Sequence, residues 1–519
     1  MMKLITAETA RALDAEAAAS WGLDPFALVE AAGRVCARVF TGGFPGFFSC
    51  PKPPAIAVAA GSGNNAADAM VMLRSLILEG AALAGTSLVL INRLPAEGER
   101  NPRSEAFRSL AAMGVPVQVY PPETPDDKGL LARADILIDG IAGTGLRGPL
   151  RDAALALVQA VNSLRNPRPF VLAIDAPSGN SDSWEPGMPI MEADATLGIE
   201  PMKLALYKPA ARRFAGAILP VGGVFPAPLV TRFEGAERLC WETVRNRLLP
   251  IRPDAYKYDR GVAEIRAGSP GSAGAARIAA KGAQAAGAGI VRLLVDEGLY
   301  PILAHDAGGV MTAVNGSPAD DSQRFTPDAV LLGPGWGTGA DRKGLLETAL
   351  KREGEGTPLI LDADAIALAR GLVFSGRAIL TPHPGEFAAF TGLSREGILT
   401  DPVPVLRETA RQIRGTILFK GHVLYVAASD GRLGILDGMN PALASGGSGD
   451  LLAGFCAALA ARMARAGNFD GYTCAAVAAG LLIASASASE NARRFFDPAD
   501  LADTAASLSG EAWLREAWL

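Results

Sequence analysis

A glycine-dense run, Gly446-Gly447-Ser448-Gly449-Asp450, is the strongest chemical signal in the chain. It stands just before a stretch with helical apolar spacing, so its backbone N–H groups and the helix dipole could hold a transferring phosphate. Asp450 could take a proton from a hydroxyl as the phosphoryl group arrives. A simple N-cap aspartate behind a flexible loop is the alternative, but a cap does not need so many glycines. We therefore predict a phosphoryl-transfer site here, with Asp450 as the catalytic residue.

Three polar motifs in the first half follow candidate strands, at residues 61–68, 139–148 and 175–179. The first is rich in small residues and opens a helix, which suits an anion at a helix N-terminus. Because the carboxyl ends of strands in a doubly wound sheet form one crevice, the three motifs should converge. Taken singly, each aspartate could be a helix N-cap, but three motifs together favour a site. Its oxygen-rich side chains, Asn65, Asp139 and Ser178, could bind a hard monovalent or divalent cation.

The elements that must position these motifs are short apolar runs that alternate with helical stretches. Runs with few polar breaks are typical of strands buried on both faces of a parallel sheet. The resulting βαβ series predicts a doubly wound α/β sheet, with a helix over residues 68–78. The candidate strands of the first half are residues 55–60, 87–91, 136–139, 170–175 and 195–199. Those of the second half are residues 290–295, 329–332, 359–362, 378–380 and 416–419, followed by a strand–turn–strand signal over 424–436 and a helix through 451–463.

Length and composition limit the architecture further. A chain of 519 residues is long enough for two domains, and a composition of 49% hydrophobic and 20% charged residues excludes a mainly disordered protein. A net charge of −5 provides no global basic field for nucleic acid. The proline- and glycine-rich stretch 220–253 predicts a boundary near residue 230, which gives domains over residues 1–228 and 229–519.

Cysteine usage and the most apolar segment indicate the compartment. Five scattered cysteines without a CxxC pair argue against a disulfide framework or a zinc site. The first residues lack the apolar core of a signal peptide. Residues 474–488 are rich in alanine, serine and glycine and are shorter than a membrane span needs, so we expect a buried helix there. These features favour a cytoplasmic chain in a reducing environment.

In order and spacing, the three motifs of the first half resemble the NAD(P)H-hydrate epimerase domain over about the first 225 residues. Residues 28–33 look like the N-terminal helix motif of that family. The resemblance implies a Rossmann-like three-layer αβα fold, with Asp175 facing the substrate as the proton-transfer residue. It implies a K+ ion on Asn65, Asp139 and Ser178. It also implies contacts with the hydrated dinucleotide from Asn64, Asn65, Asp68, Gly143, Thr144, Gly145, Leu146, Arg147, Gly148 and Lys203.

The first motif departs from the family pattern. The family loop reads Asn-Asn-Gly-Gly-Asp-Gly, whereas this chain has Ala66, Ala67 and Ala69 at the glycine positions. A Cβ takes room from a phosphate and disfavours a positive φ. Ala31 also replaces the asparagine that the helix motif usually carries. These changes leave open that the first domain only binds a ligand or serves as a scaffold.

The second half resembles the NAD(P)H-hydrate dehydratase domain, a ribokinase-like family, over about residues 245–519. A lone histidine is usually structural, but His383 stands between two prolines after a strand, which favours function. Tyr256 and Ser445 replace the histidine and threonine that the family usually has. The matching motifs are residues 257–261, 274–277, 287–289, 333–337, 361–365, 381–386 and 446–450, with Lys420-Gly421 before the final loop.

This second resemblance implies a ribokinase-like αβα fold that uses Mg2+ with ADP or ATP. Asp450 would face the substrate. The hydrate would contact Ala275, His383 and a glycine of the 333–337 loop, for which we choose Gly335. The nucleotide would contact Lys420, Gly421, His422, Val423, Leu424, Gly446, Gly447, Ser448 and Gly449.

Together the two resemblances imply a bifunctional enzyme that repairs hydrated NADH and NADPH. One domain would interconvert the R and S hydrates, and the other would dehydrate the S form at the expense of ADP or ATP. The expected partners are these small molecules and further copies of the chain in a homo-oligomer, with no nucleic acid and no membrane. A ribokinase-like small-molecule kinase with an accessory N-terminal domain is the alternative, and it would release a stable phosphorylated product.

Overall fold

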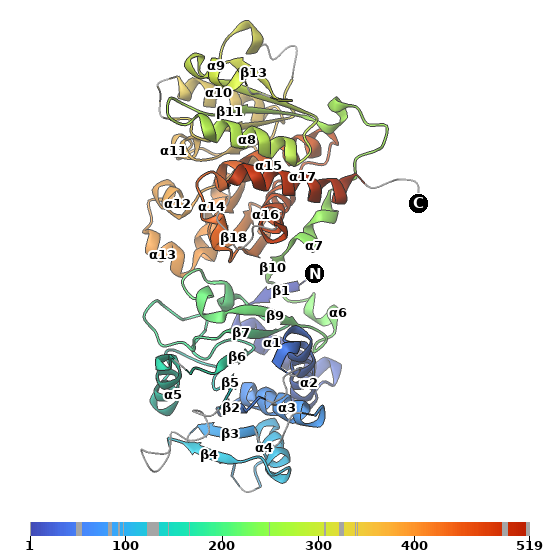
Figure 1. The fold of residues 1–519 in the computed structure, drawn as a ribbon, viewed down its shortest axis with the longest axis vertical. Coiled ribbons are helices and arrows are strands. Elements are labelled where there is room, and N and C mark those ends of the chain that lie inside the picture. The colour runs from blue at the N-terminus through green and yellow to red at the C-terminus, as the bar shows by residue number, and fades with distance from the viewer. Residues whose placement is uncertain are drawn as a thin grey trace. The chain divides into compact units, whose positions relative to one another are not determined.

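The computed structural model describes residues 2–47, 54–80, 86–91, 94–96, 98–121, 134–143, 145–165, 167–248, 250–305, 308–320, 326–337, 339, 341–489 and 497–514. They form two compact units, an N-terminal unit of residues 2–236 and a C-terminal unit of residues 237–519 (Figure 1). Each unit is a mixed α/β structure built on a mainly parallel sheet.

The N-terminal unit is built on seven parallel strands in the order β4-β3-β2-β5-β6-β7-β9. Along the chain this sheet begins with β2, adds β3 and β4 on one side, and then adds β5 on the other. The carboxyl ends of β2 and β5 therefore lie at a topological switch point, where open α/β sheets bind ligands. The strands are β2 (Ile56–Ala60), β3 (Thr86–Ile91), β4 (Val117–Tyr120), β5 (Ile136–Gly140), β6 (Phe170–Ile174), β7 (Ala195–Ile199) and β9 (Ala217–Val221).

Helices cover both faces of this sheet, and β2 shows why. Its residues Ile56, Val58 and Ala60 pack into one apolar core with α2 and α3, whereas Ala57 and Ala59 pack into a second core with α5. Because alternate residues of a strand point to opposite faces, an uninterrupted apolar strand must be covered on both. The result is a three-layer αβα unit (Figure 1). The helices are α1 (Ala7–Trp21), α2 (Pro25–Gly43), α3 (Asn64–Leu78), α4 (Pro102–Ala112), α5 (Asp152–Ser163) and α6 (Ala227–Val230).

A short parallel pair positions the first helix. Strand β1 (Met2–Ile5) pairs with β8 (Met202–Lys203), with Leu4 opposite Met202 and Ile5 opposite Lys203. Helix α1 follows β1 directly, after its N-cap Thr6. The pairing therefore brings the start of the chain next to the strand that carries Lys203.

The C-terminal unit is built on a sheet with the strand order β13-β12-β11-β14-β15-β16-β17-β18-β19-β10. Neighbouring strands are parallel except at β18, which runs antiparallel to β17 and β19. The carboxyl ends of β11 and of β14 to β17 therefore lie along one edge. The strands are β10 (Ala236–Leu239), β11 (Val262–Arg266), β12 (Ile290–Val295), β13 (Met311–Val314), β14 (Ala329–Leu332), β15 (Leu359–Leu361), β16 (Ala378–Leu380), β17 (Thr416–Phe419), β18 (Val423–Ala428) and β19 (Leu433–Asp437).

Helices also lie over both faces of the C-terminal sheet. Helices α8, α15, α16 and α17 share one large apolar core, and α10 and α14 contact the sheet from the other side (Figure 1). Helix α16 is long and apolar enough to cross a membrane by length and composition, but 67% of it is buried inside the unit, as predicted for a core helix. The helices are α7 (Trp241–Val244), α8 (Ala273–Ala285), α9 (Tyr300–His305), α10 (Arg342–Gly354), α11 (Asp364–Leu368), α12 (Pro384–Thr391), α13 (Arg395–Thr400), α14 (Pro402–Ile413), α15 (Ser448–Arg465), α16 (Gly471–Ala488) and α17 (Pro498–Trp513).

All strands predicted from uninterrupted apolar runs occur in the structure, but several others were not predicted, and β11 is the most informative of these. Glu264 and Arg266 interrupt its apolar sequence, yet all of its residues are buried. Glu264 is fully buried and forms ion pairs with Arg266 at 2.9 Å, Arg292 at 3.1 Å and Arg352 at 3.2 Å. A buried charge is tolerated when partners of opposite charge surround it. Apolar periodicity cannot reveal such a strand.

Candidate active sites

A cavity of about 550 Å3 opens at the switch point of the N-terminal unit. The loops after β2 and β5 meet there, and the Gly61 N–H donates to the Gly140 carbonyl at 3.1 Å. A Cβ on Gly143 would lie 3.0 Å from the Cβ of Asn65, so glycine relieves a tight contact between the two loops. The polar motifs at residues 61–68 and 139–148 therefore converge, as the sequence predicts.

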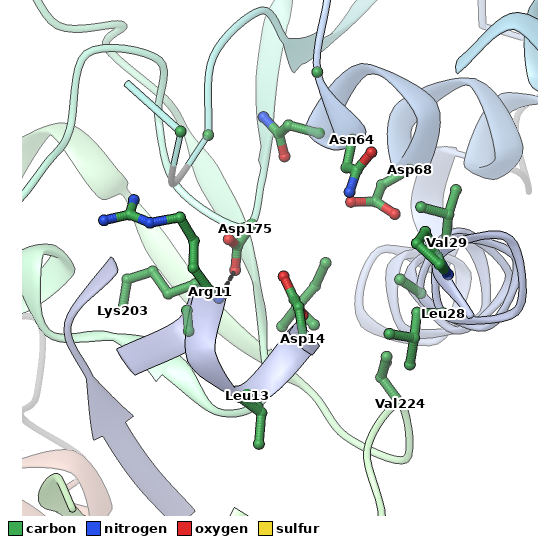
Figure 2. Close-up of a pocket in the computed structure, with 18 of the residues that line it drawn as sticks. Arg11, Leu13, Asp14, Leu28, Val29, Asn64, Asp68, Asp175, Lys203 and Val224 are labelled. Carbon is green, nitrogen blue, oxygen red and sulfur yellow. Dashed lines mark hydrogen bonds and ion pairs between the residues drawn. The ribbon is translucent and has the colours of Figure 1, made fainter. Parts of the chain in front are cut away.

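Most of the predicted substrate residues line this cavity, and Figure 2 shows several of them. Asp139 and Ser178 lie outside the lining and are fully buried. Arg147 and Gly148 belong to the described residues but do not border the cavity, and Thr144 lies outside the described residues. The predicted residues that do line it are Asn64, Asn65, Asp68, Gly143, Gly145, Leu146, Asp175 and Lys203.

Asp175 and Lys203 form an ion pair on the cavity wall, with 2.8 Å between Oδ1 and Nζ. Each side chain is only 11% exposed, so salt in the solvent screens the pair weakly. Asp175 also has a φ of 62°, a left-handed conformation that costs free energy in a non-glycine residue. The surrounding structure holds it there, as is common at functional sites. Its carboxylate is thus fixed in place and can accept a proton from a bound hydroxyl.

Two further carboxyl groups, those of Asp14 and Asp68, line the same cavity as the Asp175–Lys203 pair (Figure 2). Burial and the charge of Asp175 raise the pKa of Asp68 well above its ordinary value, although Lys203 lowers it. Removal from water raises the pKa of Asp14, which Lys203 lowers and Asp175 raises. Carboxyl groups that differ in protonation are suited to acid–base chemistry. Asp14 and its neighbour Arg11 were not predicted, because no motif of α1 distinguishes them.

Asn65, Asp139 and Ser178 offer the oxygen atoms that a hard cation needs. Asp139 accepts hydrogen bonds from the Ser178 N–H at 2.8 Å and hydroxyl at 2.5 Å, and burial raises the pKa of Asp139, although the bonds from Ser178 lower it. Asn65 is 8% exposed, and within the described part of the chain its side-chain amide has no hydrogen-bond partner. Buried polar groups normally have a hydrogen-bond partner, so a ligand would supply the one that this amide lacks. These residues fit a cation bound by oxygen atoms.

The three alanines of the first motif do not obstruct the cavity. Ala66, Ala67 and Ala69 lie inside α3, which begins at Asn64, and are fully buried in the core between the helix and the sheet. None of these three described residues borders the cavity. Their backbone is helical, so no positive φ is required. The prediction that their methyl groups take room from a phosphate is therefore wrong, because the methyl groups point into the packing beneath the site.

In the C-terminal unit, a buried ion pair lies at the edge where the parallel strands end. Lys420 Nζ, just after β17, lies 2.6 Å from Asp362 Oδ1, just after β15, and the Thr381 hydroxyl donates to the same oxygen at 2.7 Å. A Cβ on Gly449 would lie 3.3 Å from Lys420 Nζ. The amine of Lys420 is therefore next to the start of α15. Although burial lowers the pKa of Lys420, the surrounding carboxylates raise it above its ordinary value.

Asp450 lies in the first turn of α15, close enough to Asp362 and Lys420 for their charges to affect its pKa. Burial is the main cause that raises its pKa from 3.8 to about 6, with smaller contributions from Asp362 and Glu386, which raise it, and Lys420, which lowers it. A carboxyl group that titrates near neutral pH can act as a base at the pH of a cell. Its location and its pKa suit proton transfer from a hydroxyl.

The glycine run forms an uncapped helix start. Gly447 is the N-cap residue of α15 and has a φ of 99°, and no side chain of the described residues caps this helix. A Cβ on Gly447 would lie 2.7 Å from Ile278 Cδ1. The first N–H groups of a helix have no partner within the helix. The Ser448 N–H donates to the Ser445 carbonyl at 3.3 Å, and the N–H groups that follow have no side-chain cap from the described residues. Binding of an anion at this helix start stays a prediction.

The structure gives mixed support for the other predicted residues of this unit. Ala275 and Gly335 lie together, because a Cβ on Gly335 would lie 2.8 Å from that of Ala275. His383 is the N-cap of α12, and its Nδ1 accepts from the Gly385 N–H at 3.0 Å, so the structural role that a lone histidine often has is present. The side chain is 57% exposed and remains accessible. Residues 420–424 form the turn into β18, where the side chains of Val423 and Leu424 are buried, so only their backbone can reach a ligand.

Parallel sheets with polar loops and helix N-termini at their carboxyl edge are typical of α/β enzymes that bind nucleotides. Family models match both units: "NAD(P)H-hydrate dehydratase" over residues 263–507 and "YjeF-related protein N-terminus" over residues 25–205. The bifunctional NAD(P)H-hydrate repair enzyme Nnr of Salinibacter ruber is 30% identical over 88% of each chain, and that of Gloeobacter violaceus is 32% identical over 85% of each. This chain belongs to the family of bifunctional NAD(P)H-hydrate repair enzymes. Among solved structures, the ADP/ATP-dependent NAD(P)H-hydrate dehydratase of Bacillus subtilis, co-crystallised with ATP/Mg2+, is 26% identical over 53% of this chain and 99% of that chain, with a TM-score of 0.47.

Proposed function

We propose that this protein repairs hydrated NADH and NADPH in two steps. The N-terminal unit interconverts the R and S hydrates, and the C-terminal unit dehydrates the S hydrate at the expense of ADP or ATP. The observation that carries the proposal is that a bifunctional NAD(P)H-hydrate repair enzyme matches 88% of the chain, while the two matched family regions, residues 25–205 and 263–507, contain the two candidate sites. A small-molecule kinase with an accessory N-terminal domain is not favoured, because it gives no role to the ion pair and carboxyl groups in the N-terminal cavity.

Hydroxide is a poor leaving group, which explains why the dehydration needs a nucleotide. Asp450 would accept the proton of the hydroxyl at C6 while that oxygen takes the terminal phosphoryl group. The first N–H groups of α15 and the amine of Lys420 would bind the phosphate oxygens. The electron pair of the ring nitrogen then expels phosphate from C6, and loss of a proton from C5 restores the double bond. His383, Ala275 and Gly335 would border the nicotinamide ring.

Mg2+ would enter this site with the nucleotide. No three His, Cys, Asp or Glu side chains converge to form a metal centre among the residues that the structure describes. Mg2+ commonly uses one or two carboxylates together with substrate phosphates, and Asp362, Glu386 and Asp450 supply carboxylates around Lys420. The bound ion would offset negative charge on the phosphates. The acidic residues present fit this role.

In the N-terminal unit, the start of α3 would bind the pyrophosphate of the dinucleotide, since Gly63 leaves that helix without a side-chain cap from the described residues. Asn65, Asp139 and Ser178 would hold a K+ ion, which would supply positive charge beside the bound dinucleotide. Asp175, fixed beside Lys203, would accept and return the proton of the hydroxyl at C6. Asn64 and Asp68 would contact the ribose and phosphate groups from α3.

The variant Asp450→Asn tests the dehydratase assignment. With the S hydrate and ADP or ATP, the natural protein should restore the absorbance of reduced nicotinamide, and the variant should still bind the nucleotide but restore none. Asp503→Asn is the matched control, because Asp503 lies on α17 with a side chain that is 77% exposed. Unchanged turnover in Asp450→Asn would refute the assignment, and a stable phosphorylated product from the natural protein would favour the kinase.

A further inference from the structure

Helix α1 adds charged side chains to the N-terminal cavity that neither sequence motif nor family match predicts. Asp14 and Arg11 both line the cavity, although the matched family region begins only at residue 25. The pairing of β1 with β8, with Ile5 opposite Lys203, places α1 beside the ion pair. Leu13 is 1% exposed and anchors this turn of α1 in the core. The buried side chain of Leu13 therefore fixes the adjacent Asp14 at the cavity.

The charges around Asp14 come from every side of the cavity. Arg11 lies on its own helix, Asp68 on α3, Asp175 after β6 and Lys203 on β8 (Figure 2). Lys203 forms an ion pair with Asp175, with 2.8 Å between Nζ and Oδ1. Asp175 therefore has a cationic partner, whereas removal from water is the main cause that raises the pKa of Asp14, with Lys203 lowering it and Asp175 raising it. The cavity therefore contains one carboxylate held by a lysine and two further carboxyl groups, those of Asp14 and Asp68, whose pKa values are raised.

The other walls show what the cavity is suited to hold. Asn65, 8% exposed, has a side-chain amide without a hydrogen-bond partner among the described residues and lines the cavity. Leu28, Val29 and Val224 form an apolar wall. An unsatisfied buried amide implies a polar ligand group, and an apolar wall suits a ring. Asp14 lines the same cavity as both.

Epimerisation at C6 needs two proton transfers. If the C6–N1 bond breaks, the hydroxyl at C6 must lose its proton and the ring nitrogen must gain one, which gives an open-chain aldehyde. Ring closure on the opposite face returns both protons, so atoms and charge balance without any further reactant. We infer that Asp14 is the second proton-transfer residue of the N-terminal site, donating a proton to the ring nitrogen while Asp175 accepts the proton of the hydroxyl. The inference rests on the proposed epimerase function of this unit.

The experiment measures interconversion of purified R and S hydrates by the full chain, without nucleotide, across a range of pH. Asp14→Asn should lower the rate constant about 100-fold or more, the usual contribution of a positioned acid or base. In the natural protein the rate should fall as rising pH removes the proton of Asp14, and this dependence should disappear in the variant. Glu8→Gln is the matched control, because Glu8 is an exposed residue of the same helix.

A second variant keeps the test decisive if Asp14→Asn is unstable. Asp14→Glu retains a carboxyl group, so it should keep part of the rate and a pH dependence with a shifted midpoint. Wild-type rate and pH dependence in folded Asp14→Asn, or a rate for Asp14→Glu as low as that of Asp14→Asn, would overturn the role of Asp14. Absence of epimerisation in the natural protein would instead refute the proposed function of the unit, and dehydratase turnover of the S hydrate should be unchanged throughout.

Discussion

The pKa of Asp450 predicts the pH dependence of the dehydratase step. Burial is the main cause that raises this pKa from 3.8 to about 6, and a shift of about 2 units corresponds to about 3 kcal/mol of free energy that favours the protonated form. The base must be ionised to accept a proton, so activity is lost as pH falls through the pKa of about 6. We expect kcat/KM for the S hydrate at pH 5 to be about a tenth of its plateau value.

Two variants should move this midpoint in opposite directions. Lys420 lowers the pKa of Asp450 and Glu386 raises it. Lys420→Gln removes a positive charge and should move the midpoint to higher pH, whereas Glu386→Gln removes a negative charge and should move it to lower pH. Each shift should be about half a unit or more, since removal of a nearby charge commonly changes a pKa by about one unit. The glutamine at residue 386 can still accept the hydrogen bond from the His383 N–H.

The assay is the initial rate of absorbance recovery with the S hydrate at subsaturating concentration. The terminal phosphate of the nucleotide also titrates near pH 6, but this titration is common to all variants, so differences between them report the protein. An acid limb of the natural enzyme near pH 4 would refute the assignment of Asp450 as a buried base. Shifts of the two variants in the same direction would refute the electrostatic account of its pKa.

Three further changes test the packing around the sites. Ala69→Gly should destabilise the N-terminal unit by about 1–2 kcal/mol, because it lowers helix propensity and removes a buried methyl group. Urea unfolding measures this loss, and the epimerisation rate should not change. A faster epimerase would contradict the role given to this alanine. Gly447→Ala should lower dehydration turnover, because a φ of 99° is strained for alanine and a Cβ would also displace Ile278 Cδ1, 2.7 Å away. Normal turnover would show that the helix start does not depend on glycine. Glu264→Gln should lower the stability of the C-terminal unit by about 3–5 kcal/mol, since it leaves buried arginine charges without their central partner, and an unchanged melting temperature would refute this account.

The sequence predicts those parts of the fold that depend on one run of residues. Strand β2, with every residue buried, is recognisable because its five residues are all apolar. Strand β11 is not recognisable in this way, because the ion-pair partners of its buried Glu264 lie on β12 and α10, far along the chain. Strand β9 contains Pro220 and lies at the edge of its sheet, where half-exposed residues weaken the apolar signal.

For the sites too, the sequence predicts residues that follow a recognisable strand and misses residues that only tertiary contacts bring to the cavity. Asn65 and Asp175 follow buried strands, so the rule that carboxyl ends converge was enough to place them in one cavity. Asp14 follows no strand directly and belongs to no motif, and only the pairing of β1 with β8 brings it there. The helical backbone of Ala66 and Ala67 was equally hidden, because comparison with a glycine loop does not show where a helix begins. His383 illustrates a residue whose capping bond depends on its rotamer, which no sequence pattern fixes.

The central claim is that one chain carries out both steps of the repair. The most direct test is to incubate the full chain with a mixture of R and S hydrates and either ADP or ATP, and to follow both epimers with time. The account predicts complete consumption of both, with recovery of NADH or NADPH equal to the total hydrate. A reaction that stops with only the R hydrate remaining would contradict the epimerase role of the N-terminal cavity, and no consumption with either nucleotide would contradict the role of Asp450 and the α15 site.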